Sequence, residues 1–357
     1  MTSISDILKE AVSLSASDIF IVSGTAVSFK VFGNVMAVDN ETVMPADAEK
    51  MISEIFRLAD ISKKTNEVSR EMDFSFSFAG VGRFRVNVYR QRSTLAAVLR
   101  NVLFELPDSS ALNIPEEIMS LADANNGIIL ITGAAGSGKS TTLTCMIDRI
   151  NSRRRGHIVT IEDPIEFLHK HKQSIISQRE IGIDTDSYAD ALRAALRQSP
   201  NVILLGEMRD NETMSIAMTA AETGQLVLST LHTLGAVNTI DRIIDSFPTN
   251  QQHQIRMQLS MVLRAVVSQQ LLPDIDGTLH PVFEVMTVNS AIRTMIREHK
   301  THQIETVMQT SKGMQTMDTA IFRLLSEGII SEDTAVLYAS NTEMMKKKIE
   351  LHRNGDI

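Results

Sequence analysis

The stretch Gly133-Ala134-Ala135-Gly136-Ser137-Gly138-Lys139-Ser140 constrains the fold more than any other part of the sequence. It follows the apolar run 127–132 and precedes the helix-like run 141–147. A strand, a glycine-rich loop ending in Lys-Ser and a helix together form the pattern of a phosphate-binding loop. The glycines let backbone N–H groups turn toward an anion, and the helix N-terminus adds the positive end of its dipole. The sequence therefore predicts an α/β domain that binds ATP or GTP.

Within this loop, Lys139 is expected to reach the β- and γ-phosphates, and Ser140 is expected to offer its hydroxyl to Mg²⁺. A glycine-rich turn with a chance lysine would not require a buried strand before it and a helix after it. The expected nucleotide-binding residues are Gly133, Ala134, Ala135, Gly136, Ser137, Gly138, Lys139, Ser140 and Thr141.

Composition places the chain among globular proteins with room for two domains, because 43% of its 357 residues are hydrophobic. No apolar run approaches a membrane span and the first residues do not resemble a signal peptide, so we expect a cytoplasmic location. The single cysteine, Cys145, excludes an internal disulfide and a paired-cysteine zinc site, and its position predicts an inert buried thiol. The net charge of −8 argues against general nucleic-acid binding.

The pattern of apolar residues changes once along the chain. A helix-like opening followed by alternating, strand-like runs predicts a small α+β domain over residues 1–105, and a polar, proline-containing stretch at 106–115 is the expected linker. From 116 to 357, apolar strands alternate with helices, which predicts a parallel sheet flanked by helices. After about residue 250 the chain is expected to be mostly helical, ending in a helical extension over about 289–357.

Polar residues follow three strands of the predicted sheet. Ligands of open α/β sheets bind at the carboxyl ends of the strands, so these residues are candidates for a site. Glu162 follows the run 158–161, Glu207 follows 202–205, and His232 follows 226–231.

Each of the three has an expected role. A carboxylate beside a bound γ-phosphate can deprotonate the attacking water, which makes Glu162 the candidate general base. Glu207 is the candidate Mg²⁺ partner together with Ser140, and His232 is a candidate sensor of the γ-phosphate. The sequence also fits plainer interpretations, namely an acidic turn at Glu162, a surface or capping carboxylate at Glu207 and a structural histidine. Arg209 and Asp210 are expected to pair with each other.

In the segment 83–90, the period of two places Arg83 and Arg85 on one face of a strand, while Phe84, Val86 and Val88 lie on the other. The two arginines fit either a solvated strand face or a pair of cations brought to a phosphate across a domain or subunit boundary. In GTPases such an arginine contributes roughly 10³ to 10⁵ in rate.

Taken together, the phosphate loop and the segments 160–167, 206–210 and 229–233 resemble the Walker A, Asp, Walker B and His boxes of secretion-superfamily ATPases. Ala291-Ile292-Arg293-Thr294-Met295-Ile296-Arg297-Glu298, followed by the run 313–318, resembles the C-terminal signature of the twitching-motility (PilT) group of type IV pilus retraction ATPases. Read alone, the first of these two segments is an amphipathic helix with Ile292, Met295 and Ile296 in its apolar stripe.

The resemblance implies an N-terminal PAS-like α+β domain and a C-terminal RecA-like P-loop ATPase domain in a homo-hexamer that hydrolyses ATP with Mg²⁺. It implies that Glu162, Glu207, His232, Arg83 and Arg85 act in catalysis. Nucleotide-driven domain closure would act on an inner-membrane platform protein, and indirectly on the pilin fibre, from the cytoplasmic face of the membrane at the pilus base. No nucleic-acid partner is expected.

Two positions depart from the pattern of that group, because Gln225 and Phe20 stand where histidines are common. Gln225 still forms hydrogen bonds but carries no charge, so any proton-linked role is absent there. Four other interpretations remain open: an accessory ATPase, an assembly or secretion ATPase of the same superfamily, a RecA-like nucleic-acid translocase, and a nucleotide-binding scaffold without turnover.

Overall fold

The computed structural model describes residues 3–31, 33–102 and 106–354, and divides the chain into two compact units. The first unit comprises Met1–Glu105 together with Ile165–Leu168, and the second comprises Leu106–Pro164 and His169–Ile357. The end of the expected first domain, at residue 105, lies outside the described residues.

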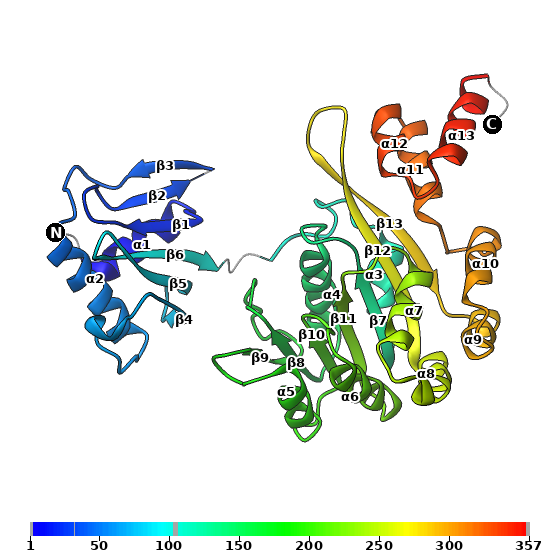
Figure 1. Cartoon of the computed structure of the whole chain (residues 1–357), viewed down its shortest axis with the longest axis horizontal. Coiled ribbons are helices and arrows are strands. Elements are labelled where there is room, and N and C mark those ends of the chain that lie inside the picture. The colour runs from blue at the N-terminus through cyan, green and yellow to red at the C-terminus, as the bar shows by residue number, and fades with distance from the viewer. Residues whose placement is uncertain (1–2, 32, 103–105, 355–357) are drawn as a thin grey trace. The chain divides into compact units, whose positions relative to one another are not determined.

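The first unit is a six-stranded antiparallel sheet with two helices (Figure 1). The strand order is β3-β2-β1-β6-β5-β4. Its elements are α1 (Ile4–Ser13), β1 (Asp18–Ile21), β2 (Ser28–Val31), β3 (Asn34–Ala37), α2 (Pro45–Leu58), the 3₁₀ turn η1 (Thr65–Glu67), β4 (Glu71–Phe78), β5 (Gly82–Gln91) and β6 (Thr94–Val102).

Alternating side chains along the strands give this sheet one apolar and one polar face. Ile7 and Leu8 of α1 and Ile52 and Ile55 of α2 share one buried core with inward residues of the sheet such as Phe84. The α+β character predicted for this part of the chain is confirmed.

The second unit is built on a seven-stranded sheet in the order β13-β12-β7-β11-β10-β8-β9. Its strands are β7 (Gly127–Thr132), β8 (His157–Glu162), β9 (Ile175–Glu180), β10 (Val202–Leu205), β11 (Leu226–Leu231), β12 (Leu263–Pro273) and β13 (Leu279–Thr287). Its helices are α3 (Glu116–Leu121), α4 (Lys139–Arg153), α5 (Tyr188–Ala195), α6 (Asn211–Glu222), α7 (Ala236–Asp245), α8 (Thr249–Val262), α9 (Ser290–Arg297), η2 (Thr301–Gln303), α10 (Ile304–Thr310), α11 (Met317–Ser326), α12 (Glu332–Tyr338) and α13 (Thr342–Asn354).

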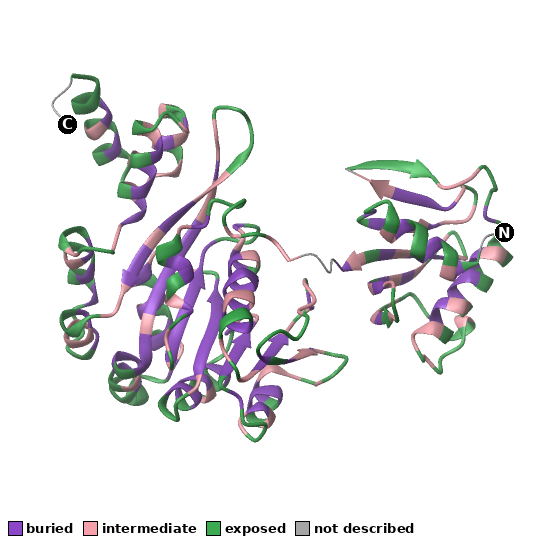
Figure 2. Cartoon of the chain, turned by 180° about the vertical axis from the view of Figure 1, so that it is seen from behind, coloured by how far each residue is buried: buried purple, intermediate pink, exposed green. Residues whose placement is uncertain are grey.

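Helices cover both faces of this sheet, which explains the continuous apolar runs of its inner strands. Residues of α5, α6, α7, α8, α9 and α10 share one core with one face, while α3 and α4 share another core with the opposite face. Every residue of β7, β10 and β11 is buried, as the unbroken purple arrows of Figure 2 show. A further core joins Leu272 and Val282 to α11, α12 and α13.

The expectation of a mostly helical chain after about residue 250 is wrong for residues 263–287. These residues form β12 and β13, an antiparallel pair in which β12 also runs parallel to β7. The sheet is therefore mixed at this edge and parallel elsewhere. The predicted class, an α+β part followed by a helix-flanked α/β part with C-terminal helices, is confirmed.

Candidate functional site

The glycine-rich loop connects β7 to α4 and depends on three glycines with positive φ. Gly133 has φ 142°, Gly136 has φ 78° and Gly138, at the N-cap of α4, has φ 86°. Side chains rarely adopt these conformations. At Gly133 space is also lacking, since a Cβ there would lie 2.2 Å from the backbone oxygen of Gln269. The loop therefore has the backbone that its sequence pattern predicts.

Lys139 lies inside this loop. Its Nζ donates hydrogen bonds to the carbonyl oxygens of Gly133 at 2.9 Å and Ala134 at 2.7 Å, and only 7% of the residue is exposed. Ser140 is exposed in the first turn of α4, where free backbone N–H groups and the helix dipole favour an anion. A buried hydroxyl, that of Ser137, has no hydrogen-bond partner within the described residues. These groups converge as a phosphate site requires.

Strand β12 supports the loop from the neighbouring position in the sheet. The Gln269 side-chain oxygen accepts a hydrogen bond from Thr142 Oγ1 at 2.8 Å, and its amide nitrogen would lie 2.8 Å from a Cβ at Gly138. Sequence reasoning missed Gln269 because it did not predict β12.

A cavity of about 280 Å³ adjoins the start of α4. Leu112, Ile114, Leu271 and Pro281 supply apolar surface, and Thr141 lines it from the loop side. Apolar walls next to a phosphate loop suit a nucleotide base.

The side chains predicted at the strand ends lie at the same edge of the sheet, because β8, β10 and β11 are consecutive parallel strands. Glu162 is the last residue of β8, and its Oε1 accepts hydrogen bonds from Thr160 Oγ1 at 2.6 Å and Gln178 Nε2 at 3.1 Å. The carboxylate of Glu207 is 12% exposed and pairs with Arg209 and with His232, whose Nε2 is 3.4 Å from Glu207 Oε2.

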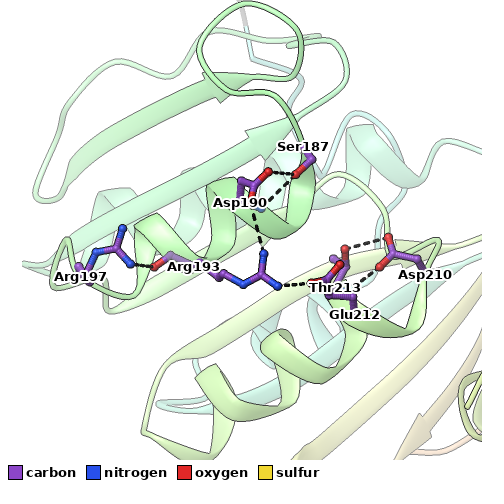
Figure 3. Close-up of polar contacts among 7 residues, drawn as sticks. All are labelled: Ser187, Asp190, Arg193, Arg197, Asp210, Glu212 and Thr213. Atoms are coloured by element: carbon purple, nitrogen blue, oxygen red, sulfur yellow. Dashed lines mark hydrogen bonds and ion pairs between the residues drawn. The ribbon is translucent and has the colours of Figure 1, made fainter.

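The expected pairing of Arg209 with Asp210 is wrong. Arg209 pairs with Glu207, whereas Asp210 is the N-cap of α6 and accepts hydrogen bonds from Thr213 N at 2.8 Å and Thr213 Oγ1 at 2.9 Å. Figure 3 shows this cap beside Arg193, which pairs with Asp190 on its own helix α5 and with Glu212 on α6. The cap therefore holds the start of α6, which follows the Glu207 segment. The ion pair between Arg193 and Glu212 joins α6 to α5, the helix that follows β9.

Tyr188, at the start of α5, is a site residue that sequence reasoning missed. Its hydroxyl would lie 2.9 Å from a Cβ at Gly206, so it fills the space beside the residue that precedes Glu207. Burial raises the pKa of Tyr188, and the carboxylates of Asp163 and Glu207 raise this pKa further. The phenol is therefore a neutral group among acidic side chains.

Arg83 and Arg85 belong to the first unit, on β5. Their alternation with buried Phe84 and Val86 confirms the predicted faces of the strand. Arg83 Nη1 donates to Ser77 Oγ at 3.3 Å, and Arg85 lines a polar hollow together with Asp18.

Cys145 is buried, and its Sγ lies 3.3 Å from the carbonyl oxygen of Pro107. Burial raises the pKa of its thiol to about 11, which confirms the predicted inert thiol.

The predicted apolar stripe of the C-terminal signature also exists. In α9, Ile292 and Ile296 are buried and Met295 packs against the same core, while Arg297 is exposed.

The fold and the loop together define a P-loop protein of the α/β class. The family model for type II/IV secretion system proteins matches residues 1–280. The chain belongs to the type II/IV secretion system protein family, and the family resemblance noted from its sequence is confirmed.

Individual relatives are similar over nearly the full length. A Pseudomonas aeruginosa protein named type IV pilus retractation ATPase PilT is 40% identical, covering 93% of this chain and 96% of its own. From the same organism, type IV pilus ATPase PilU is 37% identical, covering 98% and 92%. A crystal structure of the pilus retraction motor PilT with bound ADP has a TM-score of 0.86 and 43% identity, covering 97% of this chain and all of that one. Nucleotide binding is thus supported by a solved structure of the same fold.

No helix within the described ranges combines the length and apolarity that crossing a membrane requires.

Proposed function

We propose that this protein is an ATP-hydrolysing motor that powers type IV pilus retraction. The observation that carries the proposal is the buried Lys139 inside a loop of three positive-φ glycines, in a chain that matches a pilus retraction motor over 97% of its length. The names of the relatives support ATPase activity and pilus retraction.

In the proposed site, phosphates lie on the N–H groups of residues 133–141, and the base occupies the cavity next to Thr141. Ser140 and Glu207 are the residues that would hold Mg²⁺. Hydroxyl and carboxylate oxygens suit this cation, which usually keeps several waters and phosphate oxygens, so no cage of protein carboxylates is needed. A cation held there would supply positive charge to offset that of the phosphates.

For hydrolysis, water attacks the γ-phosphorus while the bond to the β-phosphate oxygen breaks, which releases ADP and phosphate. Glu162 accepts the proton of that water. His232 reports the state of the γ-phosphate through its contact with Glu207, and Arg83 and Arg85 add positive charge from a neighbouring domain or subunit. The subunits form a hexamer at the cytoplasmic face of the membrane at the pilus base, where domain closure acts on a platform protein.

The cellular test is deletion of the gene in its own host, with surface pili counted by electron microscopy. A retraction motor predicts excess pili without motility, restored by the wild-type gene but not by Lys139→Ala or Glu162→Gln. A surface without pili would assign the protein to assembly. An unchanged count would contradict retraction and favour an accessory or secretion role.

The biochemical test is ATP turnover per subunit as a function of protein concentration. If the arginines act from a neighbouring subunit, specific activity rises as rings assemble, and Arg83→Ala with Arg85→Ala removes most of the activity. Constant specific activity across the assembly range would contradict this arrangement.

A further inference from the structure

Two side chains from adjacent strands hold the Glu162 carboxylate at one oxygen. Thr160 lies two residues before Glu162 on β8, so both side chains are on the same face of the strand. Gln178 is the register partner of Thr160 on β9. Thr160 Oγ1 donates to Glu162 Oε1 at 2.6 Å and Gln178 Nε2 donates to the same oxygen at 3.1 Å. The position of this carboxylate is therefore fixed from two directions.

Gln178 is itself oriented by a second hydrogen bond. The backbone N–H of His169 donates to Gln178 Oε1 at 2.8 Å. A carboxylate only accepts and a backbone N–H only donates, so a single orientation of the amide satisfies both neighbours. The donor end of Gln178 must then face Glu162.

We propose that Gln178 and Thr160 are positioning residues for ATP hydrolysis, which act by fixing the Glu162 carboxylate and favouring its ionised form. This inference rests on the proposed role of Glu162 as the general base. Hydrogen bonds donated to a carboxylate stabilise the charged form, which is the form that accepts a proton. Catalytic geometry tolerates displacements of about 0.5 Å, and an error of about 1 Å costs on the order of 100-fold in rate.

The test variants remove or keep the hydrogen-bond donors of Gln178 and Thr160. Gln178→Met keeps an unbranched side chain but has no hydrogen-bond donor, and Gln178→Glu replaces the donor by a second carboxylate. Thr160→Val keeps the shape of the side chain without its hydroxyl, while Thr160→Ser retains the donor. Ile175→Thr changes an exposed residue on the same strand and serves as the matched control.

We expect Gln178→Met and Thr160→Val each to lower kcat about 10-fold or more, with KM within about twofold of wild type. The acidic limb of the pH dependence of kcat moves to higher pH, and it moves further in Gln178→Glu because like charges disfavour ionisation. Thr160→Ser brings the limb back toward the wild-type position, and Ile175→Thr does not shift it. Loss of packing alone would lower the unfolding midpoint without moving the limb.

Glu162→Gln, measured in parallel, separates the two proposals. If Glu162→Gln hydrolyses ATP normally, the role of Glu162 as base is wrong, and the positioning role falls with it. If Glu162→Gln is inactive but folded, while Gln178→Met and Thr160→Val keep the wild-type kcat and acidic limb, only the positioning role is wrong. If Thr160→Val does not fold, Gln178→Met alone tests the positioning role. This variant is expected to fold because β9 is an edge strand and Gln178 is only half-buried.

Discussion

The contact between Tyr188 and Gly206 gives a prediction that geometry alone determines. Gly206 is not among the residues with positive φ, so its backbone accepts alanine. In Gly206→Ala the new methyl group meets the Tyr188 hydroxyl at 2.9 Å. The next neighbours, Ile161 O at 3.4 Å and Glu162 Cα at 3.5 Å, leave it room. Among these three neighbours, the Tyr188 hydroxyl oxygen is the one that the new methyl group would approach too closely.

The magnitudes follow from this contact. Overpacking of a dense core costs about 1–3 kcal/mol, and we expect Gly206→Ala to lose about 1–2 kcal/mol because the phenol end shifts partly aside. The Tyr188 hydroxyl makes no hydrogen bond to any residue that the structure describes, so Tyr188→Phe costs less than about 0.5 kcal/mol. With the oxygen removed, Gly206→Ala is tolerated and lowers the entropy of the unfolded chain. The double variant is therefore about as stable as Tyr188→Phe, with a favourable coupling of about 1–2 kcal/mol.

The assay is urea unfolding of the wild type, both single variants and the double variant at one protein concentration. Circular dichroism is the suitable probe because the chain contains no tryptophan. The affected transition is that of the second unit, and a change in its midpoint at constant slope reports stability. Additive losses, with coupling below about 0.5 kcal/mol, would refute the contact.

Three further predictions follow from other sites. Glu284→Ala should destabilise the second unit by about 1–3 kcal/mol in urea unfolding, because the Glu284 carboxylate accepts hydrogen bonds from Ala236 N at 2.6 Å and Met317 N at 3.2 Å, at the start of α7 and α11; unchanged stability would exclude this double cap. Gly133→Ala should weaken ATP binding at least about 10-fold in a titration with a fluorescent nucleotide, because its Cβ meets a backbone oxygen at 2.2 Å, whereas Gly136→Ala, with nothing within 4 Å, should lose only about 1 kcal/mol to strain; equal effects would contradict the steric explanation. Burial lowers the pKa of His169 to about 4, so its contribution to stability is fully present above pH 6.5 and is lost as the pH falls toward 4. His169→Gln should therefore reduce the loss of stability between pH 7 and pH 5, and an identical pH dependence in both proteins would contradict this assignment.

The strands β7, β8, β10 and β11 were predictable from sequence because each is a short, mostly apolar run. Strand β12 was not, since Ser268, Gln269 and Gln270 interrupt its apolar pattern. Two of these polar residues are buried and hydrogen-bonded to distant parts of the chain. Ser268 Oγ accepts a hydrogen bond from Gly235 N at 3.0 Å, and Gln269 Oε1 accepts one from Thr142 Oγ1 in α4 at 2.8 Å. Local periodicity contains no signal for such long-range contacts.

The same distinction applies to the site. Lys139, Glu162, Glu207 and His232 follow apolar strands, so their position along the chain indicates their position in the sheet. Tyr188 comes from the start of a helix and meets the site only through its packing on Gly206. Tyr188 is placed at the site by tertiary packing, which the sequence pattern does not reveal.

The dependence of the loop on β12 has a consequence for biosynthesis. Thr142 and Gln269, which join the two elements, are 127 residues apart in the chain. At about 5–20 residues per second, a ribosome needs roughly 6–25 s to add that interval. Throughout that time the nascent loop lacks the strand that packs against Gly133 and Gly138. ATP is therefore expected to be a ligand of the finished domain and to give little help to the chain while it is still being translated.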